Sequence, residues 1–282
     1  MGYLAVPSEA PRFRPSRYRG QNFLVDRAIQ QRIADAAQLP PSATVVEIGA
    51  GTGNLTEHLL ARAARVLAVE IEPALVALLK ERFGPRDGLT LLRADARELN
   101  FDALVGGAFH VVANLPYSIG TRLVVDLLQR PRPPLSLTIL LQREVADRMV
   151  ARPGAMALLS VLVQSLAAVD VLFRVPATAF RPRPEVESAL LRLVPYALDD
   201  AARAIVRRRI AIARHGFAQP RKMMRNSLAA GLQREPPAID AAFAAAGLDP
   251  RWRPGELALE AWDRVARAMD GWTPDAAARA RT

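Results

Sequence analysis

The sequence predicts an α/β fold in which helices cover a mostly parallel sheet and a smaller all-helical part follows. Its 282 residues are 51% hydrophobic, which is enough for a large buried core. Short apolar runs alternate with helical patterns, and strands separated by helices indicate a parallel sheet. The five runs are Thr44 to Ile48, Arg65 to Val69, Leu89 to Leu92, His110 to Ala113 and Thr138 to Leu141.

Two more β-like runs complete the sheet, and the strand signals then stop. Ala168 to Phe173 and Ala189 to Val194 flank a proline-rich segment, and their short separation predicts an antiparallel addition at the sheet edge. Beyond Asp199 only helical patterns remain, at Ala201 to His215, Lys222 to Gly231, Ala238 to Gly247 and Glu256 to Met269. We therefore expect a basic flexible arm at 1–19, an α/β domain at 20–197, a helical domain at 198–271 and a loose tail at 272–282.

The charge of the chain predicts a polyanionic partner. The formal net charge is +10 and the pI is about 11.0, and nucleic acid is the commonest partner of such a surface. Only Lys80 and Lys222 are lysines, so the arginine bias also fits a GC-rich genome. The best candidate nucleic-acid face lies in the helical part, with a merely solvated helix face as its rival. Its residues are Arg207, Arg208, Arg221, Lys222 and Arg225.

Other features of the composition narrow the class of protein. The absence of cysteine excludes disulfides and cysteine-ligated metals, and the three histidines show no ligand spacing, so no metal is expected. No apolar run reaches the roughly 18 to 20 residues that span a bilayer. We expect a soluble cytoplasmic protein without a membrane partner.

A glycine-rich turn follows the first predicted strand, Thr44 to Ile48. Gly49, Gly51 and Gly53 let the backbone turn tightly and approach a ligand, although a strand-to-helix turn without a ligand is the alternative. Glu70 ends the next strand, where it could accept both hydroxyls of a ribose, and Asp95 follows the third, where it could accept from an adenine amino group. Each acid alone reads as a solvated side chain, but ligands of open α/β sheets bind at these strand ends.

The segment Asn114-Leu115-Pro116-Tyr117 comes directly after an apolar strand. Its amide and a backbone carbonyl, aimed by the proline, could accept both hydrogens of an exocyclic amino group. The tyrosine ring could stack on the base that carries this group. This combination indicates methyl transfer to an amine.

Together these residues resemble the ribosomal RNA adenine N6-dimethyltransferases that use S-adenosylmethionine, and most closely the small-subunit branch. The resemblance covers about residues 17 to 270. It includes GQNFLVD at 20–26, EIGAGTGNLT at 47–56, NLPY at 114–117, LQREVA at 141–146, FRPRPEVESAL at 180–190 and PRKMMRNSL at 220–228. It implies a Rossmann-like class I methyltransferase domain with a seven-stranded sheet.

The resemblance also implies roles for individual residues. The cofactor contacts fall on Asn22, Leu24, Gly49, Gly51, Glu70, Asp95 and Asn114. The target adenine falls between Tyr117 and Phe180, although Phe180 by itself reads as a core ring. The chain departs from the family pattern at Ala50, Ser118 and Gly120, and its apolar 152–159 segment is shorter than expected, which leaves the RNA contacts of that loop open.

The implied partner is small-subunit ribosomal RNA in a pre-ribosomal particle, dimethylated on two adjacent adenines by a monomeric enzyme. A large-subunit adenine methylase that confers macrolide resistance shares the catalytic motifs, but the PRKMMRNSL segment argues against it. A non-catalytic ribosome-assembly or transcription factor on the same fold is the rival from another class. A nicotinamide-dependent dehydrogenase fits the glycine spacing and the basic charge less well.

Overall fold

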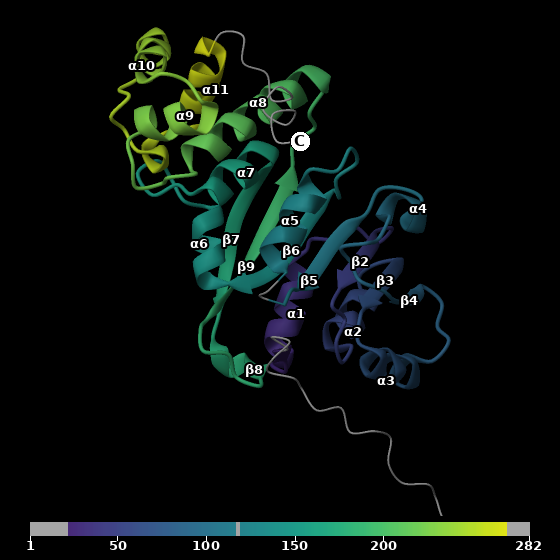
Figure 1. Cartoon of the computed structure of the whole chain (residues 1–282). Helices are drawn as coiled ribbons and strands as arrows, with labels where there is room; N and C mark the ends of the chain where they lie inside the picture. The colour runs from purple at the N-terminus through teal and green to yellow at the C-terminus, as the bar shows by residue number, and fades with distance from the viewer. Residues whose placement is uncertain (1–21, 117–118, 270–282) are drawn as a thin grey trace, which may run out of the picture. The chain divides into compact units, whose positions relative to one another are not determined.

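The central feature of the fold is a seven-stranded sheet. The computed structural model describes residues 22–116 and 119–269, so the predicted arm, the tail and Tyr117 lie outside the described residues. The strand order is β4-β3-β2-β5-β6-β9-β7 (Figure 1). The strands are β2 (Thr44–Ile48), β3 (Arg65–Glu70), β4 (Leu89–Arg93), β5 (His110–Asn114), β6 (Ser136–Gln142), β7 (Ala167–Val175) and β9 (Ser188–Pro195).

Five strands of the sheet run parallel, because β2 pairs in parallel with β3 and β5, β3 with β4, and β5 with β6. Ile48 therefore lies opposite both Val69 and Ala113. The strand order reverses beside β2, which has β3 on one side and β5 on the other. Ligands of open α/β sheets bind outside the carboxyl ends of the strands at such a reversal, so this edge is the expected site.

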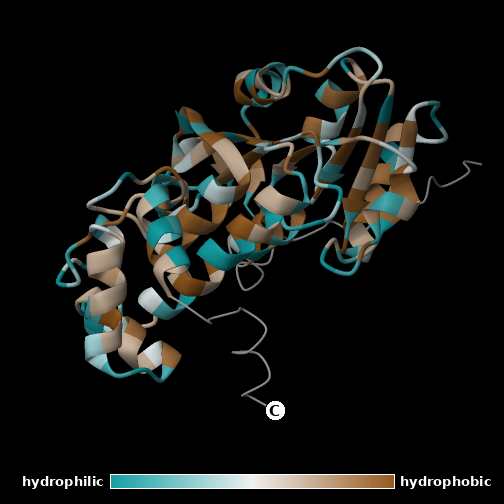
Figure 2. Cartoon of the chain, turned by 90° about the horizontal axis from the view of Figure 1, so that it is seen from above, coloured by the Kyte–Doolittle hydropathy of each residue, from teal (hydrophilic) through white to brown (hydrophobic). Residues whose placement is uncertain are grey.

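Helices connect the parallel strands, as the alternating pattern predicts. Several are amphipathic and carry both hydrophobic and hydrophilic residues, coloured brown and teal in Figure 2. The helices before the last strand are α1 (Arg27–Ala36), α2 (Asn54–Leu60), α3 (Pro73–Phe83), α4 (Phe101–Val105), α5 (Gly120–Leu128), α6 (Arg143–Met149) and α7 (Leu158–Leu166). Among the described residues no helix is long and apolar enough to cross a membrane.

A second, two-stranded sheet joins segments that are far apart in the chain. Strand β1 (Phe23–Leu24) pairs antiparallel with β8 (Phe180–Arg181), so that Phe23 lies opposite Arg181 and Leu24 opposite Phe180. A 3-10 helix, η2 (Ala177–Ala179), precedes β8. Neither strand is predicted from the sequence, because two residues are too few to show a periodic pattern.

The chain divides into two compact units. The first comprises residues up to 124 together with 134–143 and 172–192, and the second comprises 125–133, 144–171 and the residues from 193 onward. The helices of the second unit that follow the sheet are α8 (Asp200–Gly216), α9 (Met224–Leu232), α10 (Pro236–Ala245) and α11 (Leu259–Ala268), with the 3-10 helix η3 (Pro254–Glu256). The domain boundary expected at residue 197 stays a prediction.

The helical part has its own hydrophobic core. Trp262 and Phe243 are fully buried there, and the rings of Phe217 and Trp262 stack with centroids 5.6 Å apart. Met156 belongs to the same core, and its backbone N–H donates to the Gly255 carbonyl at 3.2 Å. The apolar composition of the 152–159 segment is therefore accounted for by packing within this unit.

The α/β class, the mostly parallel seven-stranded sheet and the helical C-terminal part are confirmed. All seven predicted strands form, and each differs from its predicted bounds by no more than two residues. Helix α9 starts at Met224, whereas the sequence predicts a start at Lys222. The N–H of Lys222 donates to the Gln219 carbonyl at 2.9 Å, which places Lys222 in the turn before the helix. Helix ends depend on such local bonds, which periodicity does not report.

Candidate functional site

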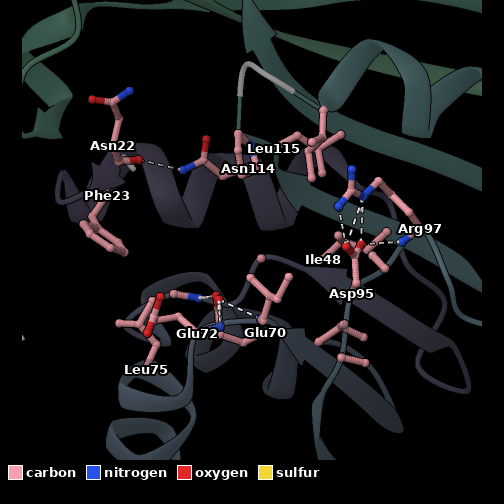
Figure 3. A pocket seen from close by; sticks show the side chains of 18 residues that line it. Asn22, Phe23, Ile48, Glu70, Glu72, Leu75, Asp95, Arg97, Asn114 and Leu115 are labelled. Carbon is pink, nitrogen blue, oxygen red and sulfur yellow. Dashed lines mark hydrogen bonds and ion pairs between the residues drawn. The ribbon is translucent and has the colours of Figure 1, made fainter. Parts of the chain in front are cut away.

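A cavity of about 360 Å³ opens at the carboxyl ends of the parallel strands (Figure 3). This volume is in the range of small-molecule sites. Its walls come from the ends of β2, β3 and β5, from the segment after β4, and from the residues before α1. The lining residues are Asn22, Phe23, Ile48, Gly49, Gly51, Val69, Glu70, Ile71, Glu72, Leu75, Ala94, Asp95, Ala96, Arg97, Asn114, Leu115, Pro116 and Ile119.

The glycine turn lines the cavity, because it directly follows the carboxyl end of β2. Gly49 has φ +76° and Gly51 has φ +58°, in the left-handed region that favours glycine. The N–H groups of Gly49 and Ala50 both donate to the Val69 carbonyl, at 2.9 and 3.2 Å, which ties the turn to the end of β3. A Cβ at Gly49 would lie 3.6 Å from the Asn114 carbonyl oxygen, an ordinary van der Waals contact, so the turn lies beside the end of β5.

Glu70, the last residue of β3, presents a buried carboxylate to the cavity. Its Oε2 accepts from the Gly51 N–H at 2.9 Å, and its Oε1 accepts from the N–H groups of Ile71 and Glu72 at 2.8 and 2.9 Å. Three of about four lone-pair positions of the carboxylate are thus filled by backbone donors. The carboxylate links the glycine turn to the end of β3 and retains acceptor capacity for a hydroxyl of a ligand.

Asp95 lies after β4 and also faces the cavity. Both of its carboxylate oxygens accept from Arg97, with the closest contact, between Nη2 and Oδ2, at 2.5 Å (Figure 3). The side-chain hydrogen bonds from Arg97 hold the pKa of Asp95 below its usual value. Asp95 is therefore an ionised acceptor at neutral pH, and in this structure its acceptor positions are occupied by a neighbouring side chain.

Asn114 ends β5 and is oriented by the segment before α1. Its Nδ2 donates to the Asn22 carbonyl at 3.3 Å. This bond assigns the amide nitrogen to the Asn22 side, so the amide oxygen faces the other way (Figure 3). Leu115 and Pro116 follow at the cavity wall, and the Pro116 carbonyl accepts from the N–H of Gly120 at 3.0 Å, which starts helix α5.

Of the predicted cofactor residues, Leu24 lies in strand β1 and Asn22 directly precedes it. The Leu24 carbonyl accepts from Gln30 Nε2 at 2.8 Å and from Asn54 Nδ2 at 3.2 Å. The Leu24 side chain is buried, whereas Asn22 and Phe23 line the cavity. The ring of Phe23 would lie 3.2 Å from a Cβ at Gly51, so it covers the turn directly.

Phe180 is only 1% exposed and packs in the core of the first unit with Leu24, Val175 and Ala179. It does not line the cavity described above. The stacking of a target adenine between Phe180 and Tyr117 stays a prediction, since Tyr117 lies outside the described residues.

Two other predicted motifs meet in space. Arg143, in LQREVA, forms an ion pair with Glu187, in FRPRPEVESAL, with Nη1 and Oε2 3.0 Å apart. The Arg143 N–H also donates to the Glu187 carbonyl at 3.0 Å. These motifs therefore support each other, although 44 residues separate the two side chains.

Glu47 lies behind the glycine turn, buried in β2. Its Oε2 accepts from the Thr56 hydroxyl at 2.6 Å, and burial raises its pKa to about 8. Its pKa makes the neutral carboxylic acid the main form at neutral pH. The polar group is thereby accommodated in the core beneath the site without a buried charge.

The predicted nucleic-acid residues do not share one environment. Arg207, Arg221 and Lys222 are exposed. Arg208 is half-buried and donates to the Met269 carbonyl at 3.3 Å, and Arg225 pairs with Asp240 at 3.0 Å. Their neighbour Arg209 forms a mostly buried ion pair with Asp263 at 2.5 Å, which joins α8 to α11. The helix thus turns only part of its arginine run toward solvent.

Several cavity residues are not among the site residues predicted from the sequence. Ile71, directly after Glu70, is 57% exposed and lines the cavity. Arg97 follows Asp95 by two residues, and Phe23 belongs to the GQNFLVD segment. Their adjacency to predicted residues is the only signal in the sequence that could have identified them.

Comparison with known proteins identifies the family. The family model described as ribosomal RNA adenine dimethylase matches residues 13–241. The ribosomal RNA small subunit methyltransferase A of Moorella thermoacetica is 40% identical over 90% of this chain and 92% of its own length. That of Anaeromyxobacter dehalogenans is 41% identical over 89% of this chain and 92% of its own length.

Solved structures support the same assignment. The 23S rRNA methyltransferase ErmE aligns with a TM-score of 0.67 and 28% identity, over 88% of this chain and 100% of that one. A dimethyladenosine transferase from Plasmodium falciparum aligns with a TM-score of 0.73 over 86% of this chain and 95% of that one; at 22% identity it supports the fold alone. The chain belongs to the ribosomal RNA adenine dimethylase family. It is an S-adenosylmethionine-dependent methyltransferase.

Proposed function

We propose that this protein transfers methyl groups from S-adenosylmethionine to N6 of adenines in small-subunit ribosomal RNA. The reaction dimethylates two adjacent adenines in a pre-ribosomal particle, and the enzyme acts as a cytoplasmic monomer. The observation that carries the proposal is the convergence of Glu70, Asp95 and Asn114 on one cavity at the carboxyl ends of the sheet. The full-length similarity to small-subunit methyltransferases supports the choice of substrate.

The residues of the cavity fit the cofactor. Asp95 offers an acceptor for the adenine amino group, and Glu70 offers one for a ribose hydroxyl. Ile48, Val69 and Ile71 give apolar walls for the adenine ring. When bound, S-adenosylmethionine supplies a methyl group on a positively charged sulfur, and no metal is needed because the leaving group is a neutral thioether.

The chain's own contribution to methyl transfer is to position and polarise the target amine. The N6 lone pair of adenine is delocalised into the ring and is a poor nucleophile. The Asn114 side-chain oxygen and the Leu115 carbonyl would accept the two N6 hydrogens and turn the lone pair toward the methyl group. As the N–C bond forms and the S–C bond breaks, N6 would lose one proton to solvent. The bond from Asn114 Nδ2 to Asn22 holds the amide in the orientation that this step requires. Positioning of this kind lowers a barrier by up to roughly 7–11 kcal/mol in favourable cases.

Exposed basic residues of the helical part support RNA binding. Arg221, Lys222 and Met223 are consecutive and exposed. They lie beside another exposed trio, residues 251–253, because the Met224 N–H donates to the Trp252 carbonyl at 2.7 Å and the Arg225 N–H to the Pro250 carbonyl at 3.0 Å. We call residues 221–223 and 251–253 the RNA patch.

The composition of the RNA patch suits an RNA strand. Arg221, Lys222 and Arg253 can contact phosphates, whereas Arg251 is paired with Asp249. Trp252 is 39% exposed, and its ring can stack on an unpaired base. Arg221 and Lys222 are among the residues predicted from the sequence, whereas residues 251–253 are not, because a tryptophan between two arginines has no periodic signature. Arg207 is a further exposed candidate, whereas the bonds of Arg208 and Arg225 within the helical part make them weaker ones.

A large-subunit methylase is the second candidate, because ErmE shares the fold and is 28% identical. The small-subunit relatives are closer, at 40% and 41% identity over about nine tenths of the chain. A non-catalytic assembly factor is a third reading, and the convergence of acceptors in the cavity argues against it.

One experiment separates these functions. The purified protein is incubated with labelled S-adenosylmethionine and with under-methylated small or large ribosomal subunits, and the labelled nucleotides are mapped. We expect dimethyladenosine at two adjacent positions of the small-subunit RNA. Label only in the large subunit would identify the second candidate. Cofactor binding without label in either subunit would favour the assembly factor.

A further inference from the structure

Arg97 donates hydrogen bonds to the carboxylate of Asp95, which is the proposed acceptor for the adenine amino group of the cofactor. Its side chain folds back over Asp95 at the cavity wall (Figure 3). Asp95 Oδ1 accepts from the Arg97 N–H at 2.9 Å and from Nε at 3.0 Å, and Oδ2 accepts from Nη2 at 2.5 Å and from Nε at 3.1 Å. A carboxylate offers about four lone-pair positions, so an incoming amino group must displace a guanidinium N–H.

The pairing arises from local sequence and needs no ligand. The same set of contacts recurs at Asp249 and Arg251, where both carboxylate oxygens accept from the arginine two residues later. An Asp-x-Arg segment in a turn therefore closes on itself. At residues 95–97 the same ion pair forms at the wall of the cavity, where the Arg97 guanidinium competes with a ligand for Asp95.

The exposure of the two side chains determines which partner can leave. The Arg97 side chain is 53% exposed, whereas that of Asp95 is 14% exposed. Arg97 can therefore move into solvent at low cost, because water replaces the carboxylate as its partner. Asp95 stays at the wall, and its backbone bond from the Arg97 N–H can persist while Nη2 releases Oδ2.

We propose that Arg97 is a specificity-determining residue. Its ion pair with Asp95 lowers the affinity for adenosyl ligands, and Arg97 releases the carboxylate only to an amino group at position 6 of the purine. The inference rests on the proposed function, since it takes the cofactor adenine to bind at Asp95. An inosine ligand has an oxygen at position 6. That oxygen cannot donate to Asp95, and its lone pairs would face the carboxylate, so an inosine ligand gains nothing at position 6 when the guanidinium is removed.

The test is calorimetric binding of S-adenosylhomocysteine and of S-inosylhomocysteine to the full-length protein. Arg97→Leu should tighten S-adenosylhomocysteine binding by about two- to fivefold, the range for removal of an exposed ion pair. Arg97→Gln should act in the same direction. Neither variant should bind S-inosylhomocysteine more tightly, so the preference for adenine should rise. Arg93→Leu is the matched control, because Arg93 is exposed nearby but does not line the cavity, and it should change neither affinity.

Other outcomes separate this inference from the proposed function. If the wild type binds S-adenosylhomocysteine and the folded Arg97 variants bind it equally or more weakly, the role of Arg97 is rejected and the proposed function stands. An equal gain for both ligands also rejects it, because the effect would not depend on the amino group. Absence of S-adenosylhomocysteine binding by the wild type would reject both.

Discussion

Glu47 and Glu70 carry the same functional group on neighbouring strands, and their surroundings give them different roles. Glu70 is at the end of β3, where three backbone N–H groups donate to its carboxylate and where it still faces the cavity. Glu47 is one residue inside the end of β2, 1% exposed, and accepts from one hydroxyl. Because of their positions relative to the strand ends, Glu70 can contact a ligand, whereas Glu47 is buried beneath the site.

The raised pKa of Glu47 predicts a pH-dependent stability. Because the folded-state pKa of about 8 exceeds the ordinary value of 4.5, the folded protein retains this proton while the unfolded chain loses it. The free energy of unfolding should fall as pH rises from about 4.5 to 8, with each unit of pKa difference corresponding to about 1.4 kcal/mol. Glu47→Gln should remove this slope and be more stable than the wild type at pH 8.

Denaturant unfolding of both proteins at pH 5 and pH 8 measures this effect. The difference between wild type and variant cancels the contributions of His58 and His110, whose pKa values are lowered by burial. Parallel pH dependences of the two proteins would show that Glu47 is ionised in the folded state.

Asn114→Ala should separate chemistry from binding. The missing acceptor matters most when the amine approaches the methyl group, so turnover should fall by on the order of 10²-fold, as for other preorganised polar groups in active sites. The affinity for ribosomal subunits should change little. Single-turnover methylation and equilibrium binding measure the two effects, and equal losses in both would make Asn114 a docking residue.

At the scale of elements, the strand-to-helix turn is built around three positive φ angles that do not have equal surroundings. A Cβ at Gly49 would meet only ordinary contacts, whereas a Cβ at Gly53 would lie 2.5 Å from the ring of Phe83 and 2.8 Å from Leu79, both on α3. Gly53 is also the N-cap of α2, with φ +80°. The turn is therefore set by packing between α2 and α3 as much as by the approach of a ligand.

Gly53→Ala should lower the free energy of unfolding by about 2–4 kcal/mol, the sum of left-handed strain and overpacking. Gly106→Ala is the matched control, because Gly106 has nearly the same left-handed conformation, φ +70° and ψ +13°, but no atom lies within 4 Å of the position that a Cβ would take there. It should cost only the strain, about 1–2 kcal/mol. Urea unfolding gives both values, and equal losses would mean that α3 yields to the added methyl group.

Gly120 shows how an element explains a departure from the family pattern. A Cβ there would lie 2.6 Å from Leu141 and 3.3 Å from Leu115, so the start of α5 packs directly on β6 and on the segment after Asn114. The glycine therefore permits a close approach in this chain, and the absence of a side chain alters packing next to the proposed catalytic residues.

At the scale of the whole molecule, the net charge of +10 is distributed among residues with different functions. Arg209 with Asp263 and Arg143 with Glu187 stabilise the fold through ion pairs, and Arg97 covers Asp95. Arg221 and Lys222 are exposed on the RNA patch, and they are the clearest candidates for phosphate contacts. Net charge therefore overstates the surface available to RNA.

Charge reversal in the RNA patch tests this distribution. Arg221→Glu with Lys222→Glu should weaken binding to small subunits and reduce the slope of log affinity against log salt by roughly 0.7–0.9 for each phosphate that is no longer neutralised. Arg65→Glu with Arg86→Glu is the control, because it changes the net charge by the same amount. Arg65 begins β3 and Arg86 precedes β4, so both exposed residues lie at the strand ends opposite the cavity. This double variant should have little effect on subunit binding or on its salt dependence. Equal losses in both double variants would indicate a general effect of net charge.

The sequence by itself determined the alternation of strands and helices, the glycine turn and the acids at the strand ends. These features follow from local periodicity and from the rule that parallel strands present their carboxyl ends at one edge. Only the tertiary structure decided that Phe23 covers Gly51, that Phe180 is buried, that Arg97 pairs with Asp95 and that Trp252 lies beside Met224. Such contacts depend on rotamers and on packing between distant segments, and no local pattern in the chain reports them.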